Sequence, residues 1–207
     1  MKVIPEGMTA GEFYQHRAGV MAEFSRIVCI SMAYFIKEHT LSMRVKSFFH
    51  AAESELLSEF ILTMNKIESY NKRWCFAGHN IKEFDIPFIC RRMLMNGLPL
   101  PPYLQLQNMK PWETNIVDTF QYWRFGDFKN FTSLKLLAAA MGLPSPKDDI
   151  DGSMVGELYW TGSPEERAAN LKRIVTYCQK DVITTGNIIL SFKNIPPIQT
   201  EEIQLVD

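Results

Sequence analysis

The order of predicted elements in this 207-residue sequence indicates an α/β domain. Two β-rich segments form a predicted hairpin in the first quarter of the chain. Helical patterns and short apolar strands then alternate, without an internal repeat or a clear linker. The chain is 46% hydrophobic, which is enough for a substantial core. Residues 1–207 are therefore expected to form one domain, with residues 193–207 as a C-terminal tail.

The first predicted elements are a helix and the hairpin. Thr9 and Glu12 have the spacing of a capping box, which predicts a helix that begins near residue 10 and runs toward Phe24. Residues 26–35 are β-branched and aromatic, as in a buried strand. Residues 42–49 alternate apolar and basic side chains, as in a half-exposed strand, and the KEHT turn joins the two.

The middle of the chain alternates helices and strands. Apolar residues at helical spacing predict a helix over 53–70, with acids in its first turn. Residues 73–77 are predicted to form a short buried strand. A helix is expected to begin at Asp85, with a proline in its first turn, and to stop at Gly97. The proline-rich residues 97–113 are expected to form an ordered loop.

The last third is predicted to contain one strand and two helices. A strand should end at or just past Asp118. Residues 131–142 have the pattern of an amphipathic helix that Gly142 closes, and 142–153 is expected to be loop. The last long helix is predicted to begin near Pro164, after a capping serine, and to run to about residue 192.

Charge and cysteine usage limit the possible partners. The formal net charge is −1, which argues against binding nucleic acid through overall charge but permits a local basic groove. Four widely spaced cysteines without a C-x-x-C pair are interpreted as buried, reduced thiols of a cytosolic protein. The longest apolar run is too short to span a bilayer. We therefore expect a cytoplasmic protein with no membrane partner.

Acidic residues occur in two apolar segments, where a purely structural hydrophobic core would not require a carboxylate. Asp85 follows a predicted strand, and Tyr177 and Asp181 lie one turn apart on one face of the last helix. Two aspartates that meet at the ends of adjacent elements would suit a hard divalent cation. Alternatives remain for each residue: Asp85 could be an N-cap, Asp181 could pair with Lys180, and Tyr177 could be a packed aromatic.

The two acidic segments resemble a known family when they are taken together. HNIKEFD, read as Asn-x-x-x-Phe-Asp, and YCQKD, read as Tyr-x-x-x-Asp, are similar to the second and third motifs of the DEDD superfamily of 3′–5′ exonucleases, tyrosine subtype. Over residues 9–192 the sequence also resembles the bacterial group that is similar to the exonuclease domain of family-B DNA polymerases.

This resemblance implies a ribonuclease-H-like fold, with a mixed five-stranded sheet and helices on both faces. It also implies hydrolysis at the 3′ ends of nucleic acid, single-stranded DNA above all, with two Mg²⁺ or Mn²⁺ ions about 4 Å apart. By motif, Asp85 and Asp181 would be metal ligands, Tyr177 would orient the attacking water, and Asn80 would stabilise the turn or touch the substrate.

The family's first motif, Asp-x-Glu on the central first strand, is absent from this chain, because Asp85 is its first aspartate. With two carboxylates instead of four, two cations would repel each other strongly, so we expect at most one weakly held metal. Three explanations remain open: an N-terminally truncated form of an active exonuclease, a degenerate protein that still binds nucleic-acid ends or another partner, or a site that Asp118 supplements.

Aromatic and basic residues interleave over 122–135, a mixture that could stack unpaired bases and hold phosphates. The alternative is a set of core aromatics under a loop with solvated lysines. Of Arg91 and Arg92, one is expected to face phosphate and the other to form a surface ion pair. His79 is interpreted as a hydrogen-bond partner rather than a base. The residues expected to contact substrate are Asn80, Phe84, Arg91, Lys129, Phe131 and Lys135.

Overall fold

A computed structural model of the protein describes residues 7, 9, 11, 18–70, 73–110, 112–144 and 150–206. Its strands are β1 (Ile30–Lys37), β2 (Leu41–Phe48), β3 (Phe76–Gly78), β4 (Ile116–Asp118) and β5 (Ile203–Val206). Its helices are α2 (Glu53–Tyr70), α3 (Asp85–Met95), α4 (Thr119–Arg124), α5 (Leu134–Ala140), α6 (Val155–Trp160) and α7 (Pro164–Phe192), with short 3-10 turns at Pro102–Leu104 and Thr200–Glu202.

The strands form two separate sheets. β1 is antiparallel to β2, with Ile30 opposite Phe48 at one end and Lys37 opposite Leu41 at the other, so the predicted hairpin is confirmed. β5 joins the other edge of β2 in parallel, and β3 pairs with β4 in parallel. The α/β class with a small mixed sheet is confirmed. The single five-stranded sheet is not found, since the described strands divide three and two.

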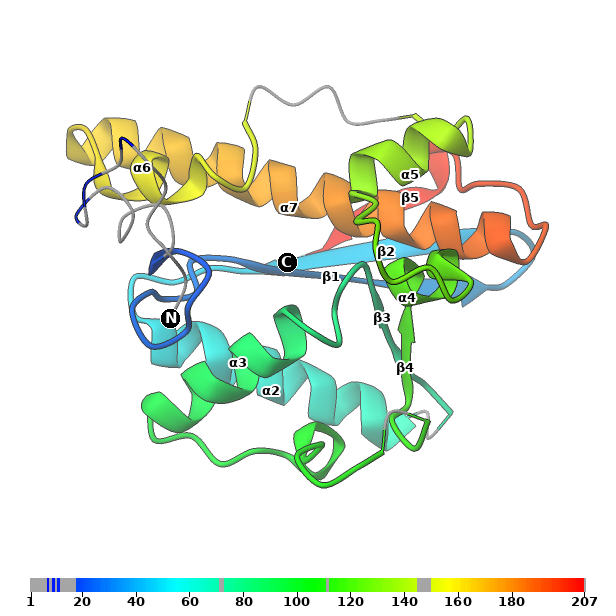
Figure 1. Cartoon of the computed structure of the whole chain (residues 1–207), viewed down its shortest axis with the longest axis horizontal. Helices are drawn as coiled ribbons and strands as arrows, with labels where there is room; N and C mark the ends of the chain where they lie inside the picture. The colour runs from blue at the N-terminus through cyan, green and yellow to red at the C-terminus, as the bar shows by residue number, and fades with distance from the viewer. Residues whose placement is uncertain are drawn as a thin grey trace.

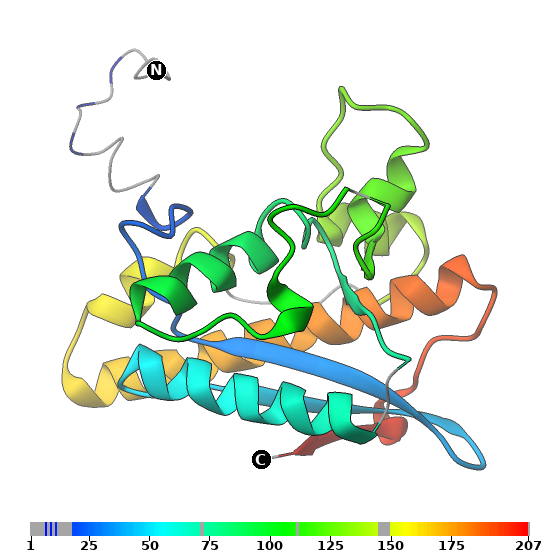
Figure 2. The ribbon, with the colours of Figure 1, turned by 90° about the horizontal axis from the view of Figure 1, so that it is seen from below.

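Helices cover both sides of the larger sheet. α7 lies on one side of β1 and β2, and α2 and α3 lie on the other (Figure 1). The view from below keeps α2 and α3 in front of the hairpin and α7 behind it (Figure 2). Phe48 and Leu56 are fully buried between β2 and α2, and Met43 and Val45 are fully buried on the opposite face of β2. The prediction of a half-exposed strand is wrong for this segment, because both faces of β2 are covered and none of its residues is exposed.

The longer helices agree with their sequence signals. α2 has the predicted bounds, and α7 begins with a complete capping box between Ser163 and Glu166. Gly97 and Gly142 follow α3 and α5 in left-handed conformations, with φ of +70° and +67°. Two short helices, α4 and α6, were not predicted. Most of the helix predicted from residue 10 lies outside the described residues, and residues 19, 20 and 22–24 form turns.

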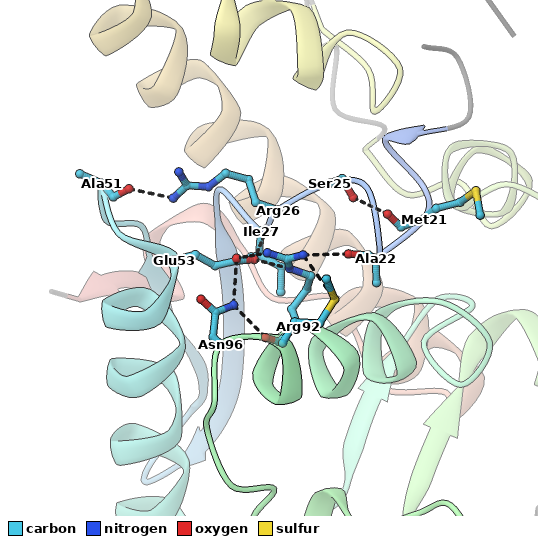
Figure 3. A network of polar contacts seen from close by, with 10 residues as sticks. Met21, Ala22, Ser25, Arg26, Ile27, Ala51, Glu53, Arg92 and Asn96 are labelled. Atoms are coloured by element: carbon cyan, nitrogen blue, oxygen red, sulfur yellow. Dashed lines mark hydrogen bonds and ion pairs between the residues drawn. The ribbon is translucent and has the colours of Figure 1, made fainter. Parts of the chain in front are cut away.

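A buried ion pair joins α2, α3 and the segment before β1 (Figure 3). Arg92 donates from Nε to Glu53 Oε1 at 2.9 Å, and a short bond links its Nη2 to Oε2. Arg92 Nη1 also donates to the Ala22 carbonyl at 2.9 Å, and Glu53 Oε1 accepts from Ile27 N at 2.6 Å. The predicted surface ion pair is therefore wrong for Arg92, because only 13% of its side chain and 7% of that of Glu53 are exposed.

Two expectations from composition can also be compared with the structure. All four cysteines are free thiols, but Cys75 is exposed and the other three are only half-buried, so the expectation of buried thiols is not met. No helix among the described residues is long and apolar enough to cross a membrane.

Candidate functional site

Asp85 is the first residue of α3, directly after the turn that follows β3. The N-cap position belongs to Phe84, which makes no side-chain cap, so Asp85 is not the N-cap residue of this helix. The Asp85 carboxyl is surrounded by protein but open to solvent on one side. Burial, and then the negative charges of Asp118 and Asp181, raise its pKa to about 6, although its own N–H acts in the opposite direction.

Tyr177 and Asp181 meet Asp85 from α7. The Tyr177 hydroxyl donates a hydrogen bond to the Asp181 carboxylate. Burial, together with the charge and the hydrogen bond of Asp181, raises the pKa of Tyr177, so the hydroxyl stays protonated at neutral pH. The charge of Asp181 also acts on Asp85. Two carboxylates and a phenol that donates a hydrogen bond therefore face one region from α3 and α7.

Asp118, at the end of β4, is buried with 4% exposure, and its oxygens accept backbone N–H groups. Oδ1 accepts from Asn80 N at 3.0 Å, Phe120 N at 3.0 Å and Gln121 N at 3.3 Å. Oδ2 accepts from Lys82 N at 3.1 Å. One carboxylate thus caps α4 and holds the turn that leads to Asp85. These bonds favour a positioning role for Asp118 over that of a metal ligand.

Asp118→Asn is expected to lower the free energy of unfolding by about 2 kcal/mol, because the amide would turn a donor toward at least one of the N–H groups that Asp118 now satisfies. Urea denaturation measures this loss. Asp127→Asn is the matched control: Asp127 also accepts a backbone N–H, from Lys129 at 3.0 Å, but it is exposed, so its substitution should change stability little. Equal effects of the two substitutions would contradict the role given to Asp118.

The turn between β3 and α3 carries Asn80 and His79. Asn80 has a left-handed backbone with φ of +61°, and its Oδ1 is buried without a partner among the described atoms. His79 makes contacts of 2.9 Å from Nδ1 to Thr119 Oγ1 and from Nε2 to the Thr132 carbonyl. The interpretation of His79 as a hydrogen-bond partner is confirmed. Because Asn80 Oδ1 is buried, only a small molecule such as water can satisfy it.

The other predicted substrate contacts are all exposed. Phe84 is 39% exposed and packs on Phe88. Arg91, Lys129 and Lys135 are exposed, and Phe131 is 66% exposed. Of these, Phe84 immediately precedes Asp85, and Arg91 lies on the same helix as Asp85.

The loop before α6 also borders the site, which was not predicted from the sequence. Asp151 acts electrostatically on Tyr177, and a β-carbon at Gly152 would lie 3.8 Å from the Tyr177 hydroxyl oxygen. The positive charge of Lys135 acts in turn on Asp151. Asp151 is exposed, and its carboxylate accepts from Ser153 N at 2.8 Å. Its D-x-S turn was visible in the sequence, but its position beside Tyr177 was not. Asp148 and Asp149 lie outside the described residues.

The donor set does not fit a pair of divalent cations. Among the residues that the structure describes, no group of three or more His, Cys, Asp or Glu side chains is placed to hold a metal ion. Asp85 and Asp181 are hard oxygen donors of the kind that Mg²⁺ and Mn²⁺ prefer. Two carboxylates are fewer than two neighbouring divalent ions need for charge balance.

Asp85→Asn is expected to stabilise the metal-free protein at neutral pH by up to about 1 kcal/mol, after allowance for solvent screening. The raised pKa means that the folded chain binds this proton more tightly than the unfolded chain, so ionisation costs stability as the pH rises from about 3.8 to about 6. The gain should vanish below about pH 4. Urea denaturation at several pH values measures it. Asp151→Asn is the control and should act in the opposite direction, because the pKa of Asp151 is lowered.

Comparison with known proteins finds a matching family. The model of a family described as a predicted 3′-5′ exonuclease related to the exonuclease domain of PolB matches residues 20–201. No curated protein matches the chain. The matched range includes the turn of Asn80, the start of α3 and the face of α7 that carries Tyr177 and Asp181. The chain belongs to the family of predicted 3′-5′ exonucleases related to the exonuclease domain of PolB.

Proposed function

We propose that this chain provides the second- and third-motif part of the active site of a metal-dependent 3′–5′ exonuclease that hydrolyses phosphodiester bonds at the 3′ ends of single-stranded DNA. The convergence of Asp85 and Asp181, with Tyr177 bonded to Asp181, carries the proposal. A carboxylate whose pKa is raised beside two further acids is typical of a functional site rather than of a surface.

The roles of the residues follow from their contacts. Asp85 and Asp181 would hold the cation, which in such enzymes activates water and stabilises the leaving oxygen. Tyr177 keeps its proton and fixes Asp181 through the hydrogen bond. Asp118 positions the turn of Asn80 and Asp85 through backbone N–H groups. Asn80 stabilises the turn, because its backbone N–H donates to Asp118. Residues 1–207 alone are expected to hold at most one cation weakly, and to be impaired or inactive.

The division into two sheets is consistent with the lack of a central strand. Within the described residues, β1 pairs only with β2, and β3 pairs only with β4. Both β1 and β3 contact α7. Unpaired strand edges are templates for a further strand. We propose that a strand with Asp-x-Glu belongs between β1 and β3 and would bring two more carboxylates to Asp85 and Asp181.

A catalytically silent domain that binds nucleic acid is the second candidate. The small number of carboxylates favours this second candidate, because the described residues then form a binding surface without a complete set of metal ligands. Such a domain would bind a single strand with or without divalent cations, and no added strand would make it cleave.

A fusion that adds an apolar strand with Asp-x-Glu ahead of the chain separates the two candidates. A 5′-labelled single strand of DNA is incubated with Mn²⁺ and the fusion, and the product lengths are resolved. Stepwise shortening from the 3′ end is expected. A matched fusion with Asn-x-Gln, which keeps the strand and removes its charges, should be inactive. Two fusions that bind the strand but release no nucleotides would support the silent domain instead.

A further inference from the structure

Three aromatic rings are exposed on the loop between α4 and α5, which stands out from the rest of the molecule (Figure 2). Phe125, Phe128 and Phe131 are 83%, 77% and 66% exposed. We call these three residues the aromatic platform. They are not the core aromatics that the sequence alternative expected. Clustered exposed rings mark interaction surfaces more often than isolated ones do.

Each ring of the platform is supported by a neighbour. Phe131 lies 4.8 Å from Phe120 between ring centroids, and Phe125 lies 6.0 Å from Tyr122. The Arg124 guanidinium lies 5.6 Å from the Phe128 centroid. The high exposure of the three rings leaves much of each accessible to a flat ligand.

The loop that carries the platform has a defined backbone. Phe125 adopts a left-handed conformation with φ of +44°, which is disfavoured for a bulky residue, and Gly126 follows at +89°. Asp127 accepts from Lys129 N at 3.0 Å and from Asn130 Nδ2 at 2.8 Å. The loop therefore presents its rings from a turn that its own hydrogen bonds stabilise.

His79 fastens this loop to the turn that leads to Asp85. Its Nε2 donates to the Thr132 carbonyl at 2.9 Å, next to Phe131 in sequence, and its Nδ1 contacts Thr119 Oγ1. Burial lowers the pKa of His79, against the effects of the Thr132 bond and the Asp118 charge, so the ring is neutral at neutral pH. The platform and the candidate metal ligand are thus attached to one short segment.

Positive charge accompanies the rings. Arg124 lies 3.9 Å from the Phe120 centroid and pairs with Glu83 at 3.7 Å. Lys129 is exposed, and no ion pair of it occurs in the described part of the chain. The only acid in the loop sequence FGDFKNFTS is Asp127, whose oxygens accept bonds within the loop. Aromatic rings beside cations are the combination that binds single strands.

We propose that the aromatic platform stacks unpaired bases of the strand whose 3′ end reaches Asp85 and Asp181. The inference rests on the proposed function, because a metal cation held by the two aspartates, together with Lys129 beside the rings, favours nucleic acid over a protein as the occupant. Since every base has a flat face, the platform would select single strands over duplexes and would tolerate any sequence.

The test measures binding by fluorescence anisotropy, with a labelled oligothymidylate and with EDTA present, so that cleavage has no influence. The double variant Phe125→Ala with Phe128→Ala is expected to weaken binding by on the order of 30-fold. Trp160→Ala is the matched control and should bind normally: Trp160 is 63% exposed, and α6 lies at the other end of α7 from α4 (Figure 1). Both variants alter exposed rings, and circular dichroism checks their folding.

A strand of equal length without bases separates stacking from phosphate binding. The natural chain should bind the abasic strand about as weakly as the double variant binds oligothymidylate. Equal affinity of the natural chain and the double variant for oligothymidylate would overturn the proposal, and so would an equal loss in the Trp160 variant. A third outcome separates the two proposals. If the aromatic platform binds oligothymidylate but the Asp-x-Glu fusion cleaves no DNA, the proposed function is wrong and the role of the platform is retained.

Discussion

Asp181→Asn is expected to lower nucleotide release by the Asp-x-Glu fusion by on the order of 1,000-fold. Asp181 supplies one of the two carboxylates that this chain brings to the cation, and it also anchors the Tyr177 hydroxyl. Its replacement by asparagine removes the negative charge and leaves the Tyr177 hydroxyl a neutral amide oxygen as its acceptor. Tyr177→Phe removes one hydrogen bond only and should cost on the order of 100-fold. Single-turnover assays with a 3′-labelled single strand measure both rates.

A matched control lies on the same helix. Glu165 is an exposed acid in the first turn of α7, so Glu165→Gln keeps the helix and removes one negative charge away from the site. Its rate should stay within about twofold of the unchanged fusion, the scale of a surface substitution. Activity that survives Asp181→Asn would mean that the cation is held elsewhere, and the assignment of α7 to the site would fail.

Arg92→Ala is expected to lower the free energy of unfolding by about 3–5 kcal/mol, because it leaves the Glu53 carboxylate buried without its cation. Burial alone would raise the pKa of Glu53, but the bonds from Arg92, Ile27 N and Asn96 outweigh burial and lower it. The stabilisation by Glu53 is therefore present above the unfolded value near 4.5 and is lost as the pH falls through the lower folded value. Urea denaturation at pH 7 measures the loss.

The neighbouring arginine is the control for this substitution. Arg91 is exposed on the same helix, and Arg91→Ala should change stability by no more than about 0.5 kcal/mol. Replacing Glu53 and Arg92 together with apolar residues of similar volume should recover most of the loss, because no buried charge then stays unpaired. Similar unfolding curves for the two single arginine variants would show that the pair does not hold α3 in place.

Local signals predicted much of the fold. α2 was found from its apolar periodicity and the acids in its first turn, α3 from its first-turn proline and the stop at Gly97, and α7 from its capping serine. β5 was missed, since residues 203–206 become a strand only by pairing with β2, far away in the sequence. α4 was missed for a related reason: Asp118 caps it, and the burial of that carboxylate is a tertiary property.

The candidate site divides in the same way. The motifs identified Asp85, Tyr177 and Asp181 from residue type and spacing. They did not show that Asp118 accepts four backbone N–H groups, because those bonds depend on how the turn before α3 meets the end of β4. The pairing of Arg92 with Glu53 was equally hidden, since it requires α2 and α3 to pack together.

The central claim is that residues 1–207 carry two of the carboxylates that a two-ion site needs, and Mn²⁺ stoichiometry tests it most directly. Free Mn²⁺ is counted by electron paramagnetic resonance during titration of the chain, the Asp-x-Glu fusion and the Asn-x-Gln fusion. At most one weak ion is expected for the chain and for the Asn-x-Gln fusion, and two tighter ions for the Asp-x-Glu fusion. Two tight ions on the chain alone, or no difference between the fusions, would contradict the claim.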